Sequence, residues 1–235
     1  MNRHPPADPC CPVVELRQYT LAPGRRDELI EIFDRHFVEG QEAVGMTVIG
    51  QFRDLQRPDR FVWLRGFADM EARRRALEAF YDGPIWIAHK DAANDTMLAW
   101  DDVLLLRPAR PDTAFGVGPD AVATTRDGRA TVLAGIYQLP QAADEDLVSR
   151  FEREVVPVLE AKEVGIEGVF VTEPAPNTFT RLPVREGEHV LAWFGIADGA
   201  AEPSHGSEVA EELALDGVPP SLLWLEPTRG RRTGS

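Results

Sequence analysis

The chain has 235 residues, enough for one large or two small domains, and its 43% hydrophobic and 27% charged residues are ordinary for a globular protein. A net charge of −14 disfavours nucleic acid and anionic membranes as partners. No segment approaches the roughly 20 apolar residues that cross a bilayer. The N-terminus also lacks the apolar core of a secretory signal, so we expect a cytoplasmic protein.

The sequence offers few ligands for a metal or a nucleotide. Cys10 and Cys11 are adjacent and have no third cysteine to pair with, which excludes a disulfide framework and a thiolate zinc site within one chain. No G-x-G-x-x-G, P-loop, H-x-x-x-H or G-x-S-x-G motif is present. We therefore expect no metal site and no obligatory cofactor.

The chain begins with a leader, residues 1–11, whose prolines predict disorder. Residues 13–21 alternate well enough to form a strand, which a proline and a glycine end. Apolar side chains then recur at helical spacing over residues 25–44, and Gly45 closes that helix.

Residues 45–67 are predicted to form a β-hairpin with two unlike faces, because side chains alternate between the faces of a strand. One face is plainly apolar. The other face mixes arginines with aromatic side chains, and it comprises Thr47, Ile49, Gln51, Arg53, Phe61, Trp63, Arg65 and Phe67.

Two helices and a strand follow the hairpin. Residues 70–80 predict a short helix, and we expect its consecutive arginines, Arg73, Arg74 and Arg75, to form a solvated face. A second helix is predicted over residues 85–99 and a short buried strand over 103–106. Residues 109–129 have the proline and glycine content of a linker.

After the linker the pattern starts again. Residues 132–139 match residues 14–21 and align the tyrosines of the two segments. One constant offset of 118 places Tyr137, Phe151, Gly168 and Phe170 on Tyr19, Phe33, Gly50 and Phe52. We interpret this as a tandem duplication of about 100 residues. The predicted domains are 12–108 and 130–227, the second one degenerate, followed by a disordered tail at 228–235.

Each copy is predicted to be β-α-β-β-α-β, the ferredoxin-like arrangement of the α+β class. Such a sheet carries both helices on one face and leaves the other face bare, and two copies can cover their bare faces by packing sheet against sheet. We therefore expect an intrachain dimeric α/β barrel, with the arginine-containing face of the hairpin directed toward the other copy.

Several segments resemble the NIPSNAP family of the dimeric α/β-barrel superfamily. They are ELRQYTLAPGRRDELIEIF, VGMTVIGQFRD, FVWLRGF, RRRALEAF, Pro84-x-Trp86 and the closing VLLLRP. The resemblance is close over residues 12–109 and only structural over 130–227. It implies the fold, while most members of the family have no assigned activity. The wider superfamily includes cofactor-free monooxygenases, polyketide cyclases, lactone isomerases and haem-using dehydratases. Eukaryotic members are associated with mitochondria, but no mitochondrial-type leader is present here.

The two predicted copies differ in polarity on the mixed face. Arg17, Gln51, Arg53 and Arg65 align with Gly135, Val169, Val171 and Phe194. One interpretation is an anion or oxyanion site of Arg53 and Arg65, walled by Tyr19 and Trp63. The alternative is that these arginines pair with Glu15, Asp54 or acidic groups of the second copy and only hold the halves together.

Two histidines are candidates for a general base, because the unperturbed pKa of histidine lies near neutrality. His89 shares a helical stripe with Trp86 and Ala93, and Asn94 lies on the same helix. His36 lies between Phe33 and Phe37, and its counterpart in the second copy is Glu154. For both, a structural histidine is the alternative.

The leading hypothesis is a metal- and nucleotide-independent enzyme that binds a small aromatic or acyl anion in the first copy. It would carry out acid/base cyclisation, dehydration, isomerisation or oxygenation. His89, His36, Arg53 and Arg65 are the proposed catalytic residues, and Tyr19, Trp63, Trp86, Gln51 and Asn94 the proposed substrate contacts. A non-catalytic binding or scaffold protein and a haem-dependent enzyme are the alternatives. Whether the two-domain chain forms a homodimer is left open.

Overall fold

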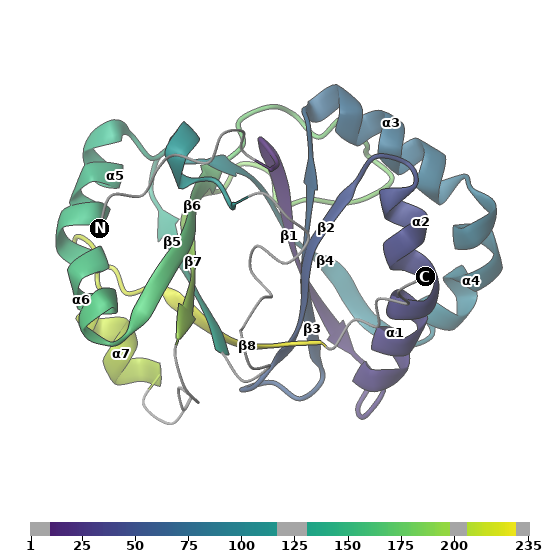
Figure 1. Ribbon diagram of the computed structural model, residues 1–235, viewed down its shortest axis with the longest axis horizontal. Coiled ribbons are helices and arrows are strands. Elements are labelled where there is room, and N and C mark those ends of the chain that lie inside the picture. The colour runs from purple at the N-terminus through teal and green to yellow at the C-terminus, as the bar shows by residue number, and fades with distance from the viewer. Residues whose placement is uncertain (1–9, 117–130, 198–205, 229–235) are drawn as a thin grey trace.

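The computed structural model describes residues 10–116, 131–197 and 206–228. The strands in these ranges form a closed barrel in the order β1-β3-β2-β8-β5-β7-β6-β4 (Figure 1). All neighbouring strands are antiparallel. The strands are β1 (Val13–Leu21), β2 (Thr47–Asp54), β3 (Arg60–Phe67), β4 (Met97–Pro108), β5 (Thr131–Leu139), β6 (Val164–Thr172), β7 (His189–Ala197) and β8 (Ser221–Pro227).

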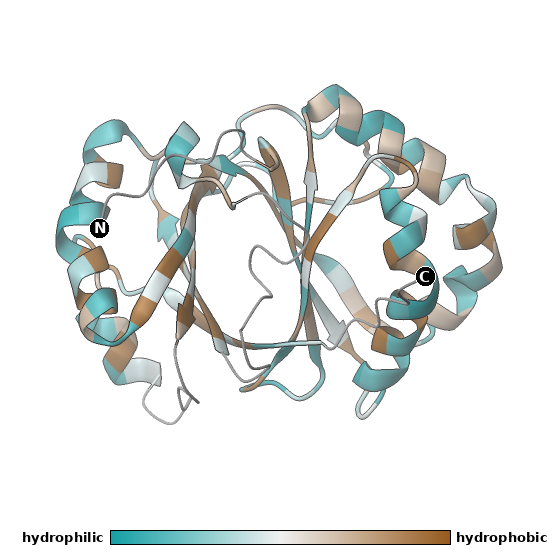
Figure 2. Ribbon diagram, viewed as in Figure 1, coloured by the Kyte–Doolittle hydropathy of each residue, from teal (hydrophilic) through white to brown (hydrophobic). Residues whose placement is uncertain are grey.

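Helices cover the barrel on two opposite sides, and their polar residues face outward (Figures 1 and 2). The first half, β1 to β4, carries α1 (Arg26–Ile32), the π-helical turn η1 (Phe33–Phe37), α2 (Val38–Glu42), α3 (Met70–Tyr81) and α4 (Pro84–Asn94). The second half, β5 to β8, carries α5 (Glu145–Arg150), the π-helical turn η3 (Phe151–Val155), α6 (Val156–Ala161) and α7 (Gly206–Glu212). No helix in the described ranges has the length and apolar character needed to cross a membrane.

The mixed α/β class with an antiparallel sheet is confirmed, and local sequence signals account for many of the boundaries. The first strand spans the predicted residues. Asp69 caps α3 by accepting a hydrogen bond from the backbone N–H of Ala72 at 2.6 Å. Pro84 occupies the first turn of α4. The predicted bounds of the last helix, 85–99, and the last strand, 103–106, of this half were wrong. The helix α4 ends at Asn94, and residues 97–108 form one long strand.

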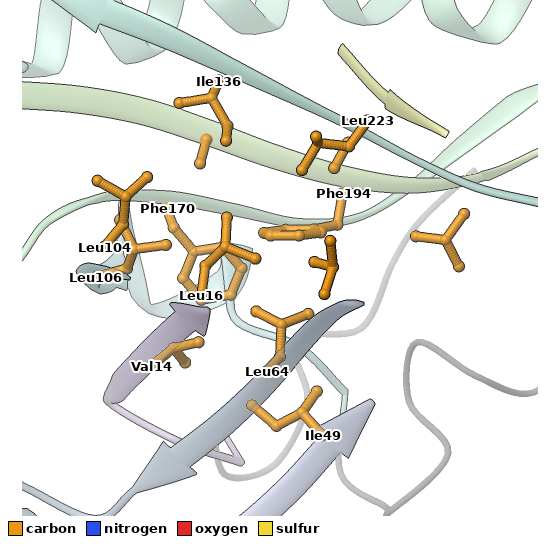
Figure 3. Close-up of a cluster of buried hydrophobic side chains, with 14 of the residues drawn as sticks. Val14, Leu16, Ile49, Leu64, Leu104, Leu106, Ile136, Phe170, Phe194 and Leu223 are labelled. Carbon is orange, nitrogen blue, oxygen red and sulfur yellow. The ribbon is translucent and has the colours of Figure 1, made fainter. Parts of the chain in front are cut away.

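The orientation predicted for the β2–β3 hairpin was wrong. Its plain apolar face, with Phe52, Val62 and Leu64, points into the barrel and packs against side chains of the second half such as Phe194 (Figure 3). The face with Trp63 and Arg65 lies under the helices of its own half. Burying the apolar face between the halves removes the more hydrophobic surface from water.

A β-bulge between Val48 and Gly50 corrects the assignment of faces further. The bulge flips the strand, so that Val48 stands opposite Arg65 and Ile49 packs into the barrel interior. A second bulge lies between Ile166 and Gly168 in β6. Bulges escape detection in sequence because the periodicity changes at a single residue.

Parts of the predicted leader and linker belong to the barrel core. Cys11 is 3% exposed and packs with the interior cluster, as does Phe115, which is 2% exposed. The Phe115 ring lies 4.5 Å from that of Phe170. The rest of the leader, residues 1–9, most of the linker, residues 117–130, and the tail from residue 229 lie outside the described ranges.

The two halves share their internal order of strands and meet at two short seams. Each half has its last strand beside its first and its hairpin on the other side of the first strand. The seam between β2 and β8 has three register pairs, beginning with Phe52 opposite Pro227. The seam between β4 and β6 also has three, beginning with Leu106 opposite Thr172. Away from the seams, the halves contact each other through the buried apolar side chains that fill the barrel interior.

Candidate functional site

Four charged side chains meet under the helices of the first half, and none of them is exposed. Glu15 and Arg17 come from β1, Arg65 from β3 and Arg73 from α3, each with 0% exposed surface. Glu15 and Arg17 lie two residues apart on one face of β1, and Arg65 stands directly opposite Glu15. The register of β1 and β3 thus creates the cluster, and α3 closes it.

Glu15 is the common acceptor of this cluster. Its Oε2 accepts hydrogen bonds from Arg17 Nη1 at 2.7 Å and from Arg65 Nε at 2.8 Å. Its Oε1 accepts one from Arg73 Nε at 2.7 Å. Arg65 also donates to Gln41 Oε1 at 3.0 Å. Burial alone raises the pKa of Glu15, but the charges of Arg65, Arg17 and Arg73 outweigh it and hold that pKa well below its usual range.

The cluster carries more positive charge than its single carboxylate can compensate. Arg17 Nη2 and Arg73 Nη2 are buried without a hydrogen-bond partner among the described residues. Uncompensated buried charge costs several kcal/mol per ion in order of magnitude. Unpaired buried guanidinium nitrogens are the groups that an anion would satisfy.

An aromatic cavity of about 30 Å³ lies beside the cluster, between the sheet and the helices. Its walls are Tyr19, Leu29, Phe33, Phe37, Gln41, Trp63, Phe80, Tyr81, Trp86, Ala93 and Met97. The cluster reaches the cavity through shared residues. The Arg65 guanidinium carbon lies 5.0 Å from the centre of the Trp63 ring, and that of Arg17 lies 5.5 Å from the Tyr19 ring.

Two walls of the cavity carry polar groups. The Tyr19 oxygen accepts a hydrogen bond from Arg17 Nε at 2.9 Å, which leaves its own O–H free to donate elsewhere. Burial raises the pKa of Tyr19, although the charge of Arg17 opposes this. The indole Nε1 of Trp63 is buried without a partner among the described residues. Both groups are donors, as binding of an anion requires.

The structure separates the residues predicted for the site. Tyr19, Trp63 and Trp86 line the cavity, and Arg65 lies in the cluster behind it. Arg53 lies away from both and pairs with Asp27 at 2.6 Å, where Asp27 is 80% exposed. Arg65 pairs with Glu15, one of the partners that the structural alternative named, whereas Arg53 pairs with Asp27, which that alternative did not name.

Other predicted residues do not line the cavity. Gln51 is buried beside Asp34, whose pKa burial raises. Asn94 is exposed at the end of α4. His36 and His89 are half-buried and stack on each other, with ring centres 3.7 Å apart and planes at 11°. Partial burial, the neighbouring His89 and Arg35 lower the pKa of His36.

Four residues of the site were missed as functional candidates. Glu15 was considered only as a structural partner, and Arg73 was assigned to a solvated face. Arg73 precedes buried Ala76 and Leu77 by three and four positions, which places it on the buried face of α3. That spacing was the available signal. Gln41 and Tyr81 gave no comparable signal, since their place depends on packing between distant segments.

Residues 14–110 match the NIPSNAP family model. The first half is a NIPSNAP domain. No curated protein matches the chain. A NIPSNAP-like domain protein from Burkholderia xenovorans has 26% sequence identity over 41% of this chain and 84% of its own, with a TM-score of 0.38.

Two solved structures span both halves. A proposed monooxygenase from Lactobacillus acidophilus has 15% identity, a TM-score of 0.51, and coverage of 92% of this chain and 94% of its own. A second proposed monooxygenase, from Fusobacterium nucleatum, has 8% identity, a TM-score of 0.54, and coverage of 96% of each chain. At these identities the similarity to the two structures establishes the fold of the chain and nothing further.

The site residues do not fit haem. No histidine lines the cavity, and the two predicted candidates, His36 and His89, stack on each other outside it, so neither is placed to serve as an axial ligand. Within the described ranges, no group of three or more His, Cys, Asp or Glu side chains is arranged to hold a metal ion.

Proposed function

We propose that the NIPSNAP domain binds a small aromatic or acyl anion in the cavity between its sheet and its helices. The observation that carries this proposal is the excess of buried guanidinium charge around Glu15, next to an aromatic cavity. Aromatic walls suit a planar apolar body, and buried donors with positive charge suit its anionic end. The ligand enters a space whose electrostatics already favour it.

In this proposal the bound anion lies against Tyr19 and Trp63. The O–H of Tyr19 and the N–H of Trp63 donate to the anionic oxygen, and the charges of Arg17 and Arg65 stabilise it from behind the two rings. A phenol with a raised pKa stays protonated at neutral pH, so Tyr19 is a donor and a general acid. This role replaces the one predicted for His36 and His89.

The chemical step that fits this site is a proton transfer to a bound enolate or phenolate. Isomerisation ends with that proton transfer, whereas in cyclisation and dehydration the acid protonates the newly formed or departing oxygen, and oxygenation needs only that the donors stabilise the anion. The rival hypothesis is binding without reaction, which the position of both histidines away from the cavity favours. The two are separated by mass spectrometry of phenolic and 1,3-dicarbonyl anions incubated with the protein. Catalysis requires conversion that Tyr19→Phe abolishes even at ligand concentrations that saturate the variant.

Binding is tested by calorimetry with 2-naphthoate and its neutral analogue 2-naphthamide. We expect the carboxylate to bind about tenfold or more tightly than the amide, since each tenfold step corresponds to about 1.4 kcal/mol. Arg17→Met should weaken carboxylate binding by a similar factor, because it removes one of the guanidinium charges next to the cavity. The variant should still fold, since Glu15 keeps its hydrogen bonds to Arg65 and Arg73. Arg53→Ala is the matched control and should bind as the wild type does. Equal binding of the two compounds would overturn the proposal.

We also propose that the two halves arose as a tandem repeat. The π-helical turns at Phe33–Phe37 and Phe151–Val155 and the two bulges occupy corresponding positions. The pairing of β6 with β7 aligns Phe194 with Leu64, so Arg65 corresponds to Gly195 and Trp63 to Trp193. This corrects the alignment of Arg65 with Phe194.

A further inference from the structure

A long loop of the second half lies against the helices of the first half. It comprises residues 173–188, between β6 and β7, and we call it the strap. The corresponding loop of the first half, between β2 and β3, comprises only residues 55–59. In Figure 1 the strap is the light green loop that extends from β6 toward α3. Its extra length is therefore a feature of one half only.

The tip of the strap is packed into the core of the NIPSNAP domain. Phe179 and Leu182 are 5% and 7% exposed and belong to the cluster that includes the cavity walls. The Phe179 ring stacks on Tyr81 with centres 5.7 Å apart and planes at 26°. On its other side Tyr81 contacts Trp86, with ring centres 4.8 Å apart. The strap thus fixes Tyr81, one wall of the cavity, from behind.

The strap also reaches the charged cluster. Asn177 Oδ1 accepts a hydrogen bond from Arg73 Nη1 at 3.0 Å. The same oxygen accepts one from the Phe179 backbone N–H at 3.1 Å, so the contact orders the tip itself. Thr178 Oγ donates to the Met70 carbonyl at 3.2 Å. Removing the tip would expose both Tyr81 and Arg73 to water.

The contacts at the outer end of the strap are weak. Arg181 pairs with Asp82 at 2.7 and 3.1 Å, but the two side chains are 54% and 64% exposed. Such pairs contribute little and are screened by salt. The two stems of the strap line a groove of about 350 Å³ together with Leu105 and Arg107. The backbone N–H groups of Glu173 and Arg185 donate to the carbonyls of Leu105 and Val103 in β4 at 2.9 and 2.8 Å, so the stems are anchored and motion is confined to the tip between them.

We propose that the strap controls access to the cavity of the NIPSNAP domain and that Phe179 sets the size of ligand that fits. The inference rests on the proposed function, since a cavity of about 30 Å³ must enlarge before it can hold an aromatic anion. Tyr81 can turn outward only when Phe179 leaves its outer face. The second half, which lacks the charged cluster, contributes the movable wall to the site of the first.

Motion of the strap is tested without any ligand, by hydrogen exchange followed by mass spectrometry. Arg181→Ala removes both the pair with Asp82 and the guanidinium that lies 4.7 Å from the centre of the Phe179 ring, so it should speed exchange in peptides covering residues 173–188 and 70–82 by about threefold or more. Exchange in the rest of the described chain should not change. Arg153→Ala is the matched control, because it removes a similarly exposed pair, Arg153 with Glu154 at 3.2 Å, on the helices of the second half. Exchange that is unchanged in Arg181→Ala would overturn the proposal.

Control of access is tested by stopped-flow binding of 2-naphthoate and benzoate. Arg181→Ala should raise the association and dissociation rates together, by about threefold, with little change in Kd. Phe179→Ala should shift preference toward naphthoate by about tenfold, since it removes the ring that holds Tyr81, a wall of the cavity, in place. Unchanged association and dissociation rates in Arg181→Ala, together with an unchanged ligand preference in Phe179→Ala, would contradict the proposal. If the wild-type protein binds neither compound, the proposed function fails, and the exchange experiment still decides whether the strap opens.

Discussion

The two halves of the barrel pack their helices against the sheet with different side chains, charged in the first half and apolar in the second. In the first half the sheet meets the helices through Glu15, Arg17 and Arg65. In the second half the corresponding positions are Leu133, Gly135 and Gly195, and the cluster around them is apolar. A Cβ atom on Gly135 would lie 2.4 Å from Trp193 Nε1, so the indole fills the space where Arg17 has its side chain. The fold therefore does not require the charges.

This difference supports the proposal that the charged cluster serves to bind an anion. Buried ion pairs are weak evidence for stability, because the cost of removing the charges from water can exceed their mutual attraction. The second half shows that apolar residues hold the same architecture together. A cluster that is dispensable for folding and carries excess charge is better explained by an anionic ligand.

The largest effect is expected from removing the only carboxylate of the cluster. Glu15→Leu copies the second half at one position and leaves three buried guanidinium groups uncompensated. We expect a loss of about 3–5 kcal/mol in the free energy of unfolding, measured by urea denaturation. The reciprocal change, Leu133→Glu, buries a lone carboxylate and should cost a similar amount. A loss below about 1 kcal/mol in both would show that water reaches these positions.

Replacing the whole cluster should have a smaller effect of opposite sign. The variant Glu15→Leu/Arg17→Met/Arg65→Met/Arg73→Met substitutes apolar side chains of similar length. We expect its stability to equal that of the wild type or exceed it by about 1–4 kcal/mol, with binding of 2-naphthoate lost. A strongly destabilised quadruple variant would instead mean that the cluster is structural, against the comparison with the second half.

The acid dependence of stability follows from Glu15. Its pKa in the folded protein lies below the ordinary value of 4.5, so the stability contributed by its ionised form is present above pH 4.5 and is lost as the pH falls through the folded-state pKa. Urea denaturation between pH 5 and 3 should show a steeper loss in the wild type than in the quadruple variant. Equal slopes would indicate that the other carboxylates determine acid unfolding.

The two corresponding tyrosines should respond differently to loss of the hydroxyl. Tyr137 donates to the Leu213 carbonyl at 2.6 Å, so Tyr137→Phe should cost about 1 kcal/mol and leave 2-naphthoate binding intact. Tyr19→Phe should have a comparable cost, since Arg17 Nε loses its acceptor, and should also weaken binding of the anion. Thermal denaturation and calorimetry together check the pair. Equal binding by both variants would remove Tyr19 from the site.

The smallest effect is expected at Arg53. Its partner Asp27 is largely exposed, so Arg53→Ala should change the free energy of unfolding by about 0–1 kcal/mol. The effect should also shrink at high salt, as urea denaturation at 0.05 and 1 M NaCl can show. A larger loss, or one independent of salt, would indicate that Arg53 acts within the buried cluster.

Much of the fold could be predicted because it depends on local periodicity. The strand at 13–21, the hairpin and the helices at 26–42 and 70–81 all follow from spacing and from caps. The orientation of the hairpin could not be predicted, since both of its faces carry large apolar side chains. Only the partner surface decides which face is buried between the halves. The bulge at Ile49 depends on the same context.

The site was harder to predict than the fold. Tyr19, Trp63 and Arg65 could be predicted because they lie on one face of the paired strands β1 and β3. Arg73 lies on another element, and Asn177 comes from the other half, so their contact depends on packing between segments distant in sequence. His36 and His89 were predicted to face the space between helix and sheet, but they stack on each other and do not line the cavity, because helical spacing does not determine which residues of a half-buried face reach it.

The covalent link between the halves has a consequence for how the molecule could change over time. In a symmetric dimer of identical chains, every substitution appears twice, once in each subunit. A chain that carries both halves can alter one and leave the other as it is. It also keeps them at a high effective concentration, so that seams of three register pairs suffice to close the barrel. Under the proposed duplication, this freedom accounts for the asymmetry of the strap and the cluster: one half could keep a pocket while the other became its cover.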